Sequence, residues 1–96
     1  MVDVQILSKV LDTGNIEIIL HNGLNSDYFP NYQNEFKFIL DHYRQFNTVP
    51  DKETFLSKFP DFTIAKVQEP DNYLLDTISE EYLYNKMVPV LKKVED

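Results

Sequence analysis

The chain has 96 residues, of which 9 are basic and 16 are acidic, so its formal net charge at pH 7 is −7. This length fits one domain with one modest hydrophobic core. The sequence contains no cysteine, which excludes a disulfide scaffold, a thiolate zinc site and a cysteine nucleophile. No apolar run approaches the roughly 20 residues that cross a bilayer, and the first residues lack the pattern of a signal peptide. We therefore expect a cytoplasmic globular protein with no membrane contact.

The acidic balance argues against direct binding of nucleic acid. Affinity for DNA or RNA comes largely from Lys and Arg side chains that neutralise phosphates. Here the nine basic residues are scattered, and only Lys92 and Lys93 are adjacent. The acidic excess instead favours a protein partner, or serves solubility alone.

The first third of the chain predicts two helices and a loop. Apolar residues recur at helical spacing over 2–11, and Gly14 is a candidate C-cap that can take a positive φ. The short apolar segment 16–21 is rich in β-branched residues and could suit a strand. Because no second clear strand exists to pair with it, we predict a helix. Asn and Gly residues over 22–27 predict a turn and a loop.

The middle of the chain predicts the strongest helix and a shorter one after it. Asn31 is a candidate N-cap, and the following residues form one broad apolar stripe. The stripe consists of Tyr32, Phe36, Ile39, Leu40, Tyr43 and Phe46. Pro50 ends this helix and begins the next one, whose buried face should carry Phe55, Leu56 and Phe59. Pro60 stops the second helix.

The last third predicts a connector over 62–68 and then further helix. The sequence Glu69-Pro70-Asp71 is typical of a helix start. The segment 77–80 resembles a capping box, which either begins a new helix or lies inside a continuous one. Pro89 lies within the final helical pattern and is expected to kink it. The whole chain, 1–96, is thus predicted to be a single all-α domain of five to seven helices.

The sequence contains no recognisable catalytic set. A P-loop needs a Gly-x-x-x-x-Gly-Lys-Ser/Thr pattern, and neither Gly14 nor Gly23 belongs to one. His21 and His42 lie in different predicted helices, without a convergent third ligand for zinc. We therefore predict no catalytic residue, no cofactor site and no metal site. The aromatic residues are expected to form the core rather than base-stacking platforms. They include Phe29, Phe36, Phe38, Tyr43, Phe46, Phe55, Phe59 and Tyr73.

Seven short segments occur along the chain in a characteristic order. They are Val4-Gln5-Ile6-Leu7 with Leu11-Asp12, Ile16 to Leu20, Asp27-Tyr28-Phe29, Phe36 and Ile39 with Tyr43, Val49-Pro50-Asp51 with Phe55-Leu56, Tyr73-Leu74-Leu75, and Glu81-Tyr82. The order of these segments resembles the N-terminal domain of DnaB-like replicative DNA helicases, especially members from phages and mobile elements. The resemblance covers nearly the whole chain and consists of apolar spacing with few fixed residues.

This resemblance implies a non-catalytic helical module that helps to organise a ring hexamer. Its implied partners are other helicase subunits and a primase or a helicase loader. In that family a helical hairpin, a linker helix and a RecA-type ATPase domain follow, so the 96 residues would be a fragment of a longer helicase. ATP and Mg²⁺ would belong to the ATPase domain, and the fragment itself would need no cofactor.

The final helix offers the candidate interaction face. Its apolar residues recur at spacings of three and four, and they pack either on this domain's own core, which is the plainer reading, or against a partner. These residues are Tyr82, Leu83, Met87, Val90, Leu91 and Val94. Three other functions compete with a helicase module: a stand-alone small adaptor or regulator that binds replication proteins, a regulator that contacts nucleic acid, and an enzyme. The charge and the lack of a catalytic set disfavour the last two.

Overall fold

The computed structural model describes the backbone of residues 2–95 and the side chains of residues 2–86. Over that range the chain is all-helical and contains no strand, which confirms the predicted fold class. The elements in chain order are α1 (Val2–Thr13), α2 (Glu17–Leu20), the 3₁₀ helix η1 (Ser26–Tyr28), α3 (Gln33–Phe46), α4 (Lys52–Lys58) and α5 (Asp71–Glu95). The segment 16–21 is thus helical, and the predicted loop after it contains η1.

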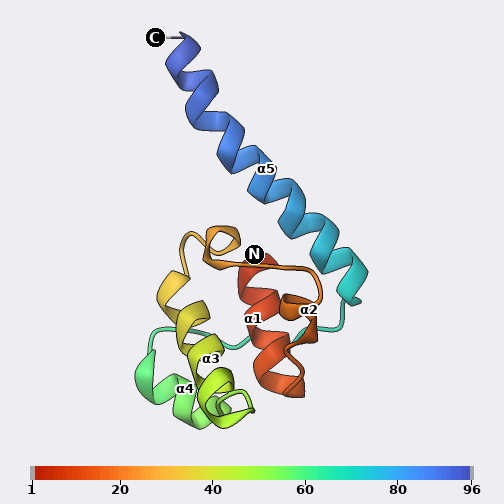
Figure 1. Ribbon diagram of the computed structural model, residues 1–96, viewed down its shortest axis with the longest axis vertical. Coiled ribbons are helices and arrows are strands. Elements are labelled where there is room, and N and C mark those ends of the chain that lie inside the picture. The colour runs from red at the N-terminus through yellow and green to blue at the C-terminus, as the bar shows by residue number, and fades with distance from the viewer. Residues whose placement is uncertain (1, 96) are drawn as a thin grey trace.

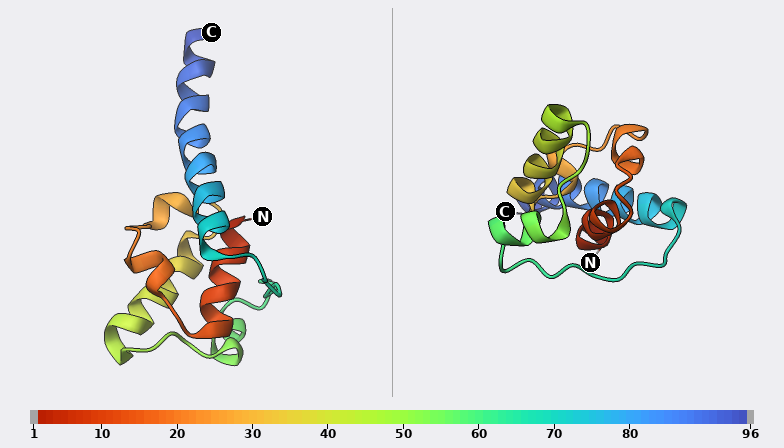
Figure 2. Two further views of the ribbon diagram at one scale, coloured as in Figure 1. Left: turned by 90° about the vertical axis from the view of Figure 1, so that its right-hand side faces the viewer. Right: turned by 90° about the horizontal axis from the view of Figure 1, so that it is seen from below.

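Helices α1 to α4 form a globule, and α5 leaves it at an angle (Figure 1). At 1.5 Å per residue, the 25 residues of α5 extend over about 37 Å. The longest dimension of the molecule is 46 Å, against 26 Å and 23 Å for the other two. Figure 2 shows the C-terminal part of α5 standing clear of the other helices in a second view. Among the described side chains of α5, those that join the core lie in its N-terminal half.

The helix boundaries follow the local chemistry of the sequence, with one correction. Gly14 has φ 73° directly after α1, as predicted, and Asn47 closes α3 in the same left-handed region at φ 59°. The predicted N-cap Asn31 is wrong: Tyr32 is the N-cap of α3, and no side chain caps this helix. The reason is a turn in which the Tyr32 N–H donates to the Phe29 carbonyl, at 2.9 Å, so that the helix starts after Tyr32.

Helix α5 runs without interruption through 77–80, which is the second of the two alternatives left open by the sequence. The Thr77 hydroxyl donates to the carbonyl of Tyr73, four residues earlier, at 2.9 Å. This bond is typical of a threonine inside a helix, so 77–80 is not a helix start. The assigned helix also continues across Pro89 to Glu95.

The core is built from apolar side chains of all five α-helices and is rich in aromatic rings. Phe55 lies at its centre and is fully buried, with the rings of Phe59 and Phe62 centred 5.1 Å and 5.0 Å from its own. Two of the aromatic residues predicted for the core are instead exposed. Phe46 is 58% exposed because it lies in the last turn of α3, and Tyr73 is 53% exposed on α5.

A buried hydroxyl attaches the connector between α4 and α5 to the globule. Ser8 on α1 is fully buried, and its Oγ accepts the backbone N–H of Ala65 at 2.9 Å. The connector contributes no regular backbone ladder at this point. The hydroxyl therefore satisfies an N–H that would otherwise lie partly buried without a partner.

Replacement of Ser8 by alanine is expected to lower the free energy of unfolding by about 1–3 kcal/mol, because the Ala65 N–H loses its acceptor. Urea unfolding followed by circular dichroism measures this change. Ser57→Ala is the matched control, since the Ser57 hydroxyl only bonds the Glu53 carbonyl on the exposed side of α4. Equal changes in the free energy of unfolding for the two replacements would show that the Ser8–Ala65 hydrogen bond does not stabilise the fold more than an exposed one.

An ion pair joins the end of α1 to the start of α4. The Lys52 ammonium donates a short hydrogen bond to the Asp12 carboxylate. This hydrogen bond, and then the positive charge of Lys52, hold the pKa of Asp12 below its ordinary value. The pair is exposed to solvent, so its electrostatic contribution is screened.

Because the pKa of Asp12 is lowered in the folded state, the pair favours folding above the unfolded pKa of about 3.9. That contribution is lost as the pH falls through the lower, folded pKa. We expect Lys52→Met to raise the pKa of Asp12 toward its ordinary value, as measured by NMR titration of the carboxyl carbon. Lys37→Met, which alters an exposed lysine of α3, should leave the Asp12 titration unchanged. An Asp12 titration insensitive to Lys52→Met would contradict the ion pair.

Candidate docking surface on helix α5

One face of α5 packs on the globule, and its register is simple. Leu74 and Ile78 are buried four residues apart, and Tyr82 follows four residues later. Tyr82 stacks on Tyr28 of η1, with ring centroids 4.1 Å apart and ring planes 14° apart. The Lys86 ammonium lies 4.9 Å from the centroid of the Tyr82 ring. We call these four residues of α5 its packing face.

The globule holds Tyr28 firmly, so the stacked pair sets the direction in which α5 leaves. The Asn25 side chain accepts the Asp27 N–H at 2.9 Å and caps η1. The next residue, Phe29, is fully buried and stacks on Phe36 with centroids 4.8 Å apart. Tyr28 is therefore fixed from both sides where its ring stacks on Tyr82 of α5.

Lys86 lies over the ring of Tyr82 on the same helix. Its interaction with the Tyr82 hydroxyl is the largest cause that raises the pKa of Lys86, and the nearby Asp27 carboxylate also contributes. A cation over a tyrosine ring gains further attraction from the ring quadrupole. Lys86 is thereby directed toward the globule, away from the opposite side of the helix.

The opposite side of α5 carries large hydrophobic side chains in solvent. Leu83 is 59% exposed and Tyr84 is 67% exposed. At about 100° per residue, Leu83 lies about 180° around the helix from the buried Leu74. The residues on this side, together with Glu81 at its edge beside Thr77 and Tyr84, form what we call the outer face of α5. They are Tyr73, Asp76, Thr77, Glu80, Glu81, Leu83 and Tyr84.

The six predicted interaction residues divide into three groups. Tyr82 is half-buried against Tyr28, and Leu83 is exposed on the outer face. The side chains of the remaining four lie outside the described residues. These four are Met87, Val90, Leu91 and Val94. The structure therefore separates Tyr82 from Leu83, although they are adjacent in sequence, because neighbours on a helix point about 100° apart.

Sequence reasoning missed Tyr84 and Tyr73 as members of the exposed surface. A signal for Tyr84 was present, since it lies three residues before Met87 and seven before Leu91. Tyr73 was assigned to the core only because it is aromatic. Its exposure follows from the register of α5, which turns Leu74 inward and leaves the preceding residue outside.

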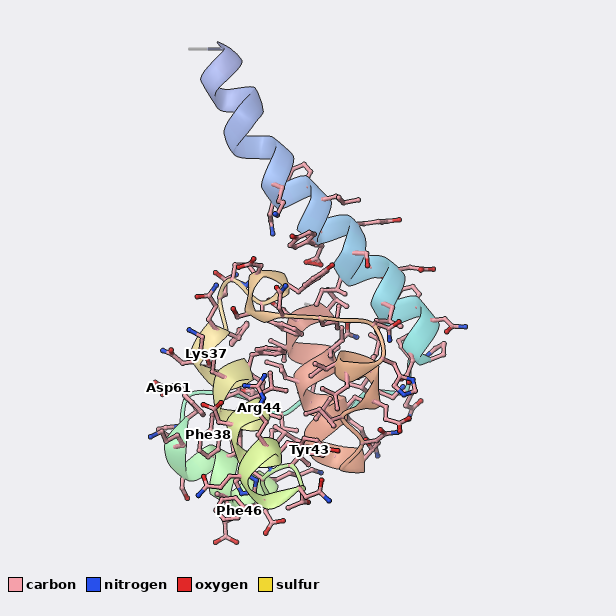
Figure 3. The ribbon with its side chains drawn as sticks, viewed as in Figure 1. Lys37, Phe38, Tyr43, Arg44, Phe46 and Asp61 are labelled. Atoms are coloured by element: carbon pink, nitrogen blue, oxygen red, sulfur yellow. The ribbon has the colours of Figure 1, made fainter. Side chains whose placement is uncertain are left out.

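Outside α5, the described residues expose two large hydrophobic side chains, Leu20 and Phe46, and Phe46 lies at the end of the globule remote from α5 (Figure 3). Its ring packs on His42, with centroids 4.8 Å apart, and the His42 Nδ1 lies 2.7 Å from the Thr48 carbonyl. Its neighbour Arg44 already pairs with Asp41 at 3.7 Å on the same helix. Phe46 is therefore a single exposed ring with satisfied neighbours, whereas α5 presents several hydrophobic side chains along one face.

Within residues 2–86, no three His, Asp or Glu side chains converge as a metal site would require. His21 lies 3.9 Å from Glu17 on the surface, and His42 packs between two phenylalanine rings. No helix of the described chain is long and apolar enough to cross a membrane.

Comparisons of this chain with protein-family models, with curated proteins and with solved structures find no match. The candidate surface is therefore defined by the exposure and the contacts of α5 alone.

Proposed function

We propose that this chain is a non-catalytic assembly and protein-docking module. One observation carries the proposal: α5 projects from the globule, and its outer face exposes Leu83 and Tyr84 to solvent. Tyrosine is enriched among the side chains that anchor protein interfaces, and an exposed apolar helix face can dock against a partner. The packing face of the same helix is already used by the core, so the outer face is free for a partner.

We further propose that the module is the N-terminal domain of a DnaB-like replicative helicase. The support is the order of the apolar segments quoted above, together with the positions of the helices along the chain. In this proposal the partners are other helicase subunits and a primase or a loader. ATP hydrolysis then belongs to a separate ATPase domain, and this chain contributes no catalytic group.

The test mixes the purified chain with a purified replicative helicase ring, its primase and its loader, and follows complex formation by sedimentation velocity. We expect binding to at least one of them and no ATP hydrolysis by the chain alone. Leu83→Glu/Tyr84→Glu should abolish the complex while the circular dichroism spectrum stays unchanged. Gln45→Glu/Phe46→Glu is the control, since it adds the same two negative charges at adjacent exposed residues of α3, far from α5.

Two results would overturn this proposal. One is ATP hydrolysis by the isolated chain that a point substitution abolishes. The other is binding to single-stranded or duplex DNA at physiological salt with a steep salt dependence, which is typical of direct phosphate contacts. If the α5 variant forms the complex as well as the parent chain does, the docking surface does not include Leu83 and Tyr84.

A further inference from the structure

The outer face of α5 combines exposed hydrophobic side chains with charge of one sign. Residues 71–85 contain four carboxylates and no Lys or Arg. Three of these carboxylates, those of Asp76, Glu80 and Glu81, lie between Tyr73 at one end of the outer face and Leu83 and Tyr84 at the other. At 1.5 Å per residue the face extends about 17 Å, or three helical turns.

The carboxylates of this face are not neutralised by the globule. The fourth carboxylate, Asp71, pairs with Lys9 at 2.6 Å at the base of α5. Among the side chains that the structure describes, no Lys or Arg forms an ion pair with Asp76, Glu80 or Glu81. The nearest base along the helix, Lys86, is directed toward Tyr82 on the other side.

We propose that the outer face of α5 docks a basic amphipathic helix of a partner protein. This inference rests on the proposed function, because it names the chemistry of the partner at the same surface. The complementary segment carries apolar residues about three turns apart, to meet the two hydrophobic ends of the face. Between them it carries Lys or Arg, to meet the three carboxylates. Charge complementarity of this kind steers association and fixes the register of the two helices.

Other partners fit this surface less well. A nucleic acid would bring phosphates against three unpaired carboxylates, which repel them. An acidic protein segment would meet the same repulsion. A purely apolar segment would bury the carboxylates without partners, which is unfavourable. Arginine or lysine satisfies the carboxylates, and arginine can also stack on the exposed tyrosine rings.

The experiment uses a synthetic 14-residue peptide that forms an amphipathic helix of Leu and Lys, labelled for fluorescence anisotropy. A second peptide replaces every Lys by Glu. We expect the Lys peptide to bind the chain at least about tenfold more tightly than the Glu peptide, with affinity that falls as salt is raised. Glu80→Lys/Glu81→Lys should weaken binding of the Lys peptide about tenfold or more.

The matched control separates this face from the general negative charge of the protein. Glu17→Lys/Glu53→Lys makes the same change in net charge at exposed residues of α2 and α4. This control variant should bind the Lys peptide nearly as well as the parent chain. If both double variants weaken binding equally, the affinity of the peptide depends only on the net charge of the protein, and the inference is wrong.

A second substitution distinguishes failure of this inference from failure of the proposed function. Leu83→Ser/Tyr84→Ser removes the hydrophobic end of the face without changing its charge. This variant should bind the Lys peptide about tenfold more weakly than the parent chain. One outcome is that the variant loses its complex with the helicase, primase or loader while the parent chain does not bind the Lys peptide. In that case the docking function stands and the basic partner is refuted. If the variant binds both the protein partner and the Lys peptide as well as the parent chain does, both proposals fail.

Discussion

Phe55→Ala is expected to lower the free energy of unfolding by about 3–5 kcal/mol, the largest effect of any single replacement considered for this protein. Phe55 is fully buried, and the rings of Phe38, Phe59 and Phe62 pack around it. Its removal eliminates apolar contact and leaves a cavity between α3, α4 and the connector. A domain of this size has roughly 5–14 kcal/mol of net stability, so the replacement should remove a large fraction of it.

Thermal and urea unfolding monitored by circular dichroism measure this loss. Phe46→Ala is the matched control, because it removes the same side chain from an exposed position at the end of α3. We expect it to change the free energy of unfolding by less than about 1 kcal/mol, mainly through lost contact with His42. Similar effects of the two replacements would mean that Phe55 does not form the centre of the core.

The second large effect concerns the attachment of α5. Ile78→Ala should lower the free energy of unfolding by about 2–5 kcal/mol, because Ile78 is almost completely buried where α5 meets the globule. Leu83→Ala, five residues later, should change it by no more than about 0.5 kcal/mol, because Leu83 is exposed. Chemical denaturation of both variants under the same conditions gives the comparison.

Hydrogen exchange provides a second measurement on the same pair of variants. An isolated helix of 12–15 residues is only marginally stable in water, so the projecting half of α5 depends on the packed half for its helicity. Ile78→Ala should therefore accelerate amide exchange along all of α5, whereas Leu83→Ala should affect only its own vicinity. Strong destabilisation by Leu83→Ala would place that residue in the core and remove the basis for the docking surface.

This contrast separates two roles within one helix. Leu74 and Ile78 hold α5 to the globule, and Tyr82 on Tyr28 fixes its direction. The side chains that face away, Leu83 and Tyr84 among them, contribute little to folding and can be replaced to test binding.

The helical architecture was predictable because its signals are local. Apolar spacing of three and four marks α1, α3 and α4, and prolines and glycines mark their ends. Gly14 was predicted as a positive-φ residue, since glycine adopts that conformation without a steric penalty. The N-cap of α3 was misplaced by one residue because the turn before it depends on the buried position of Phe29, which is a tertiary contact.

Exposure was the property that sequence reasoning judged least well. Phe46 and Tyr73 were assigned to the core on residue type, although both are exposed. The candidate interaction face included both Tyr82 and Leu83, which the structure turns in different directions. An apolar side chain in a long helix has no local mark that distinguishes a core neighbour from solvent.

The sequence by itself thus determined the all-α class, the helix boundaries to within a residue or two, the acidic charge and the want of a recognisable catalytic motif. These properties depend on residue type and on spacing along the chain. Only the tertiary structure decided that α5 is one continuous helix, that its Tyr82 stacks on Tyr28, and that Leu83 and Tyr84 remain outside. The physical reason is that burial depends on which elements meet, and the contacts of α5 with α1 and η1 join residues far apart in the sequence.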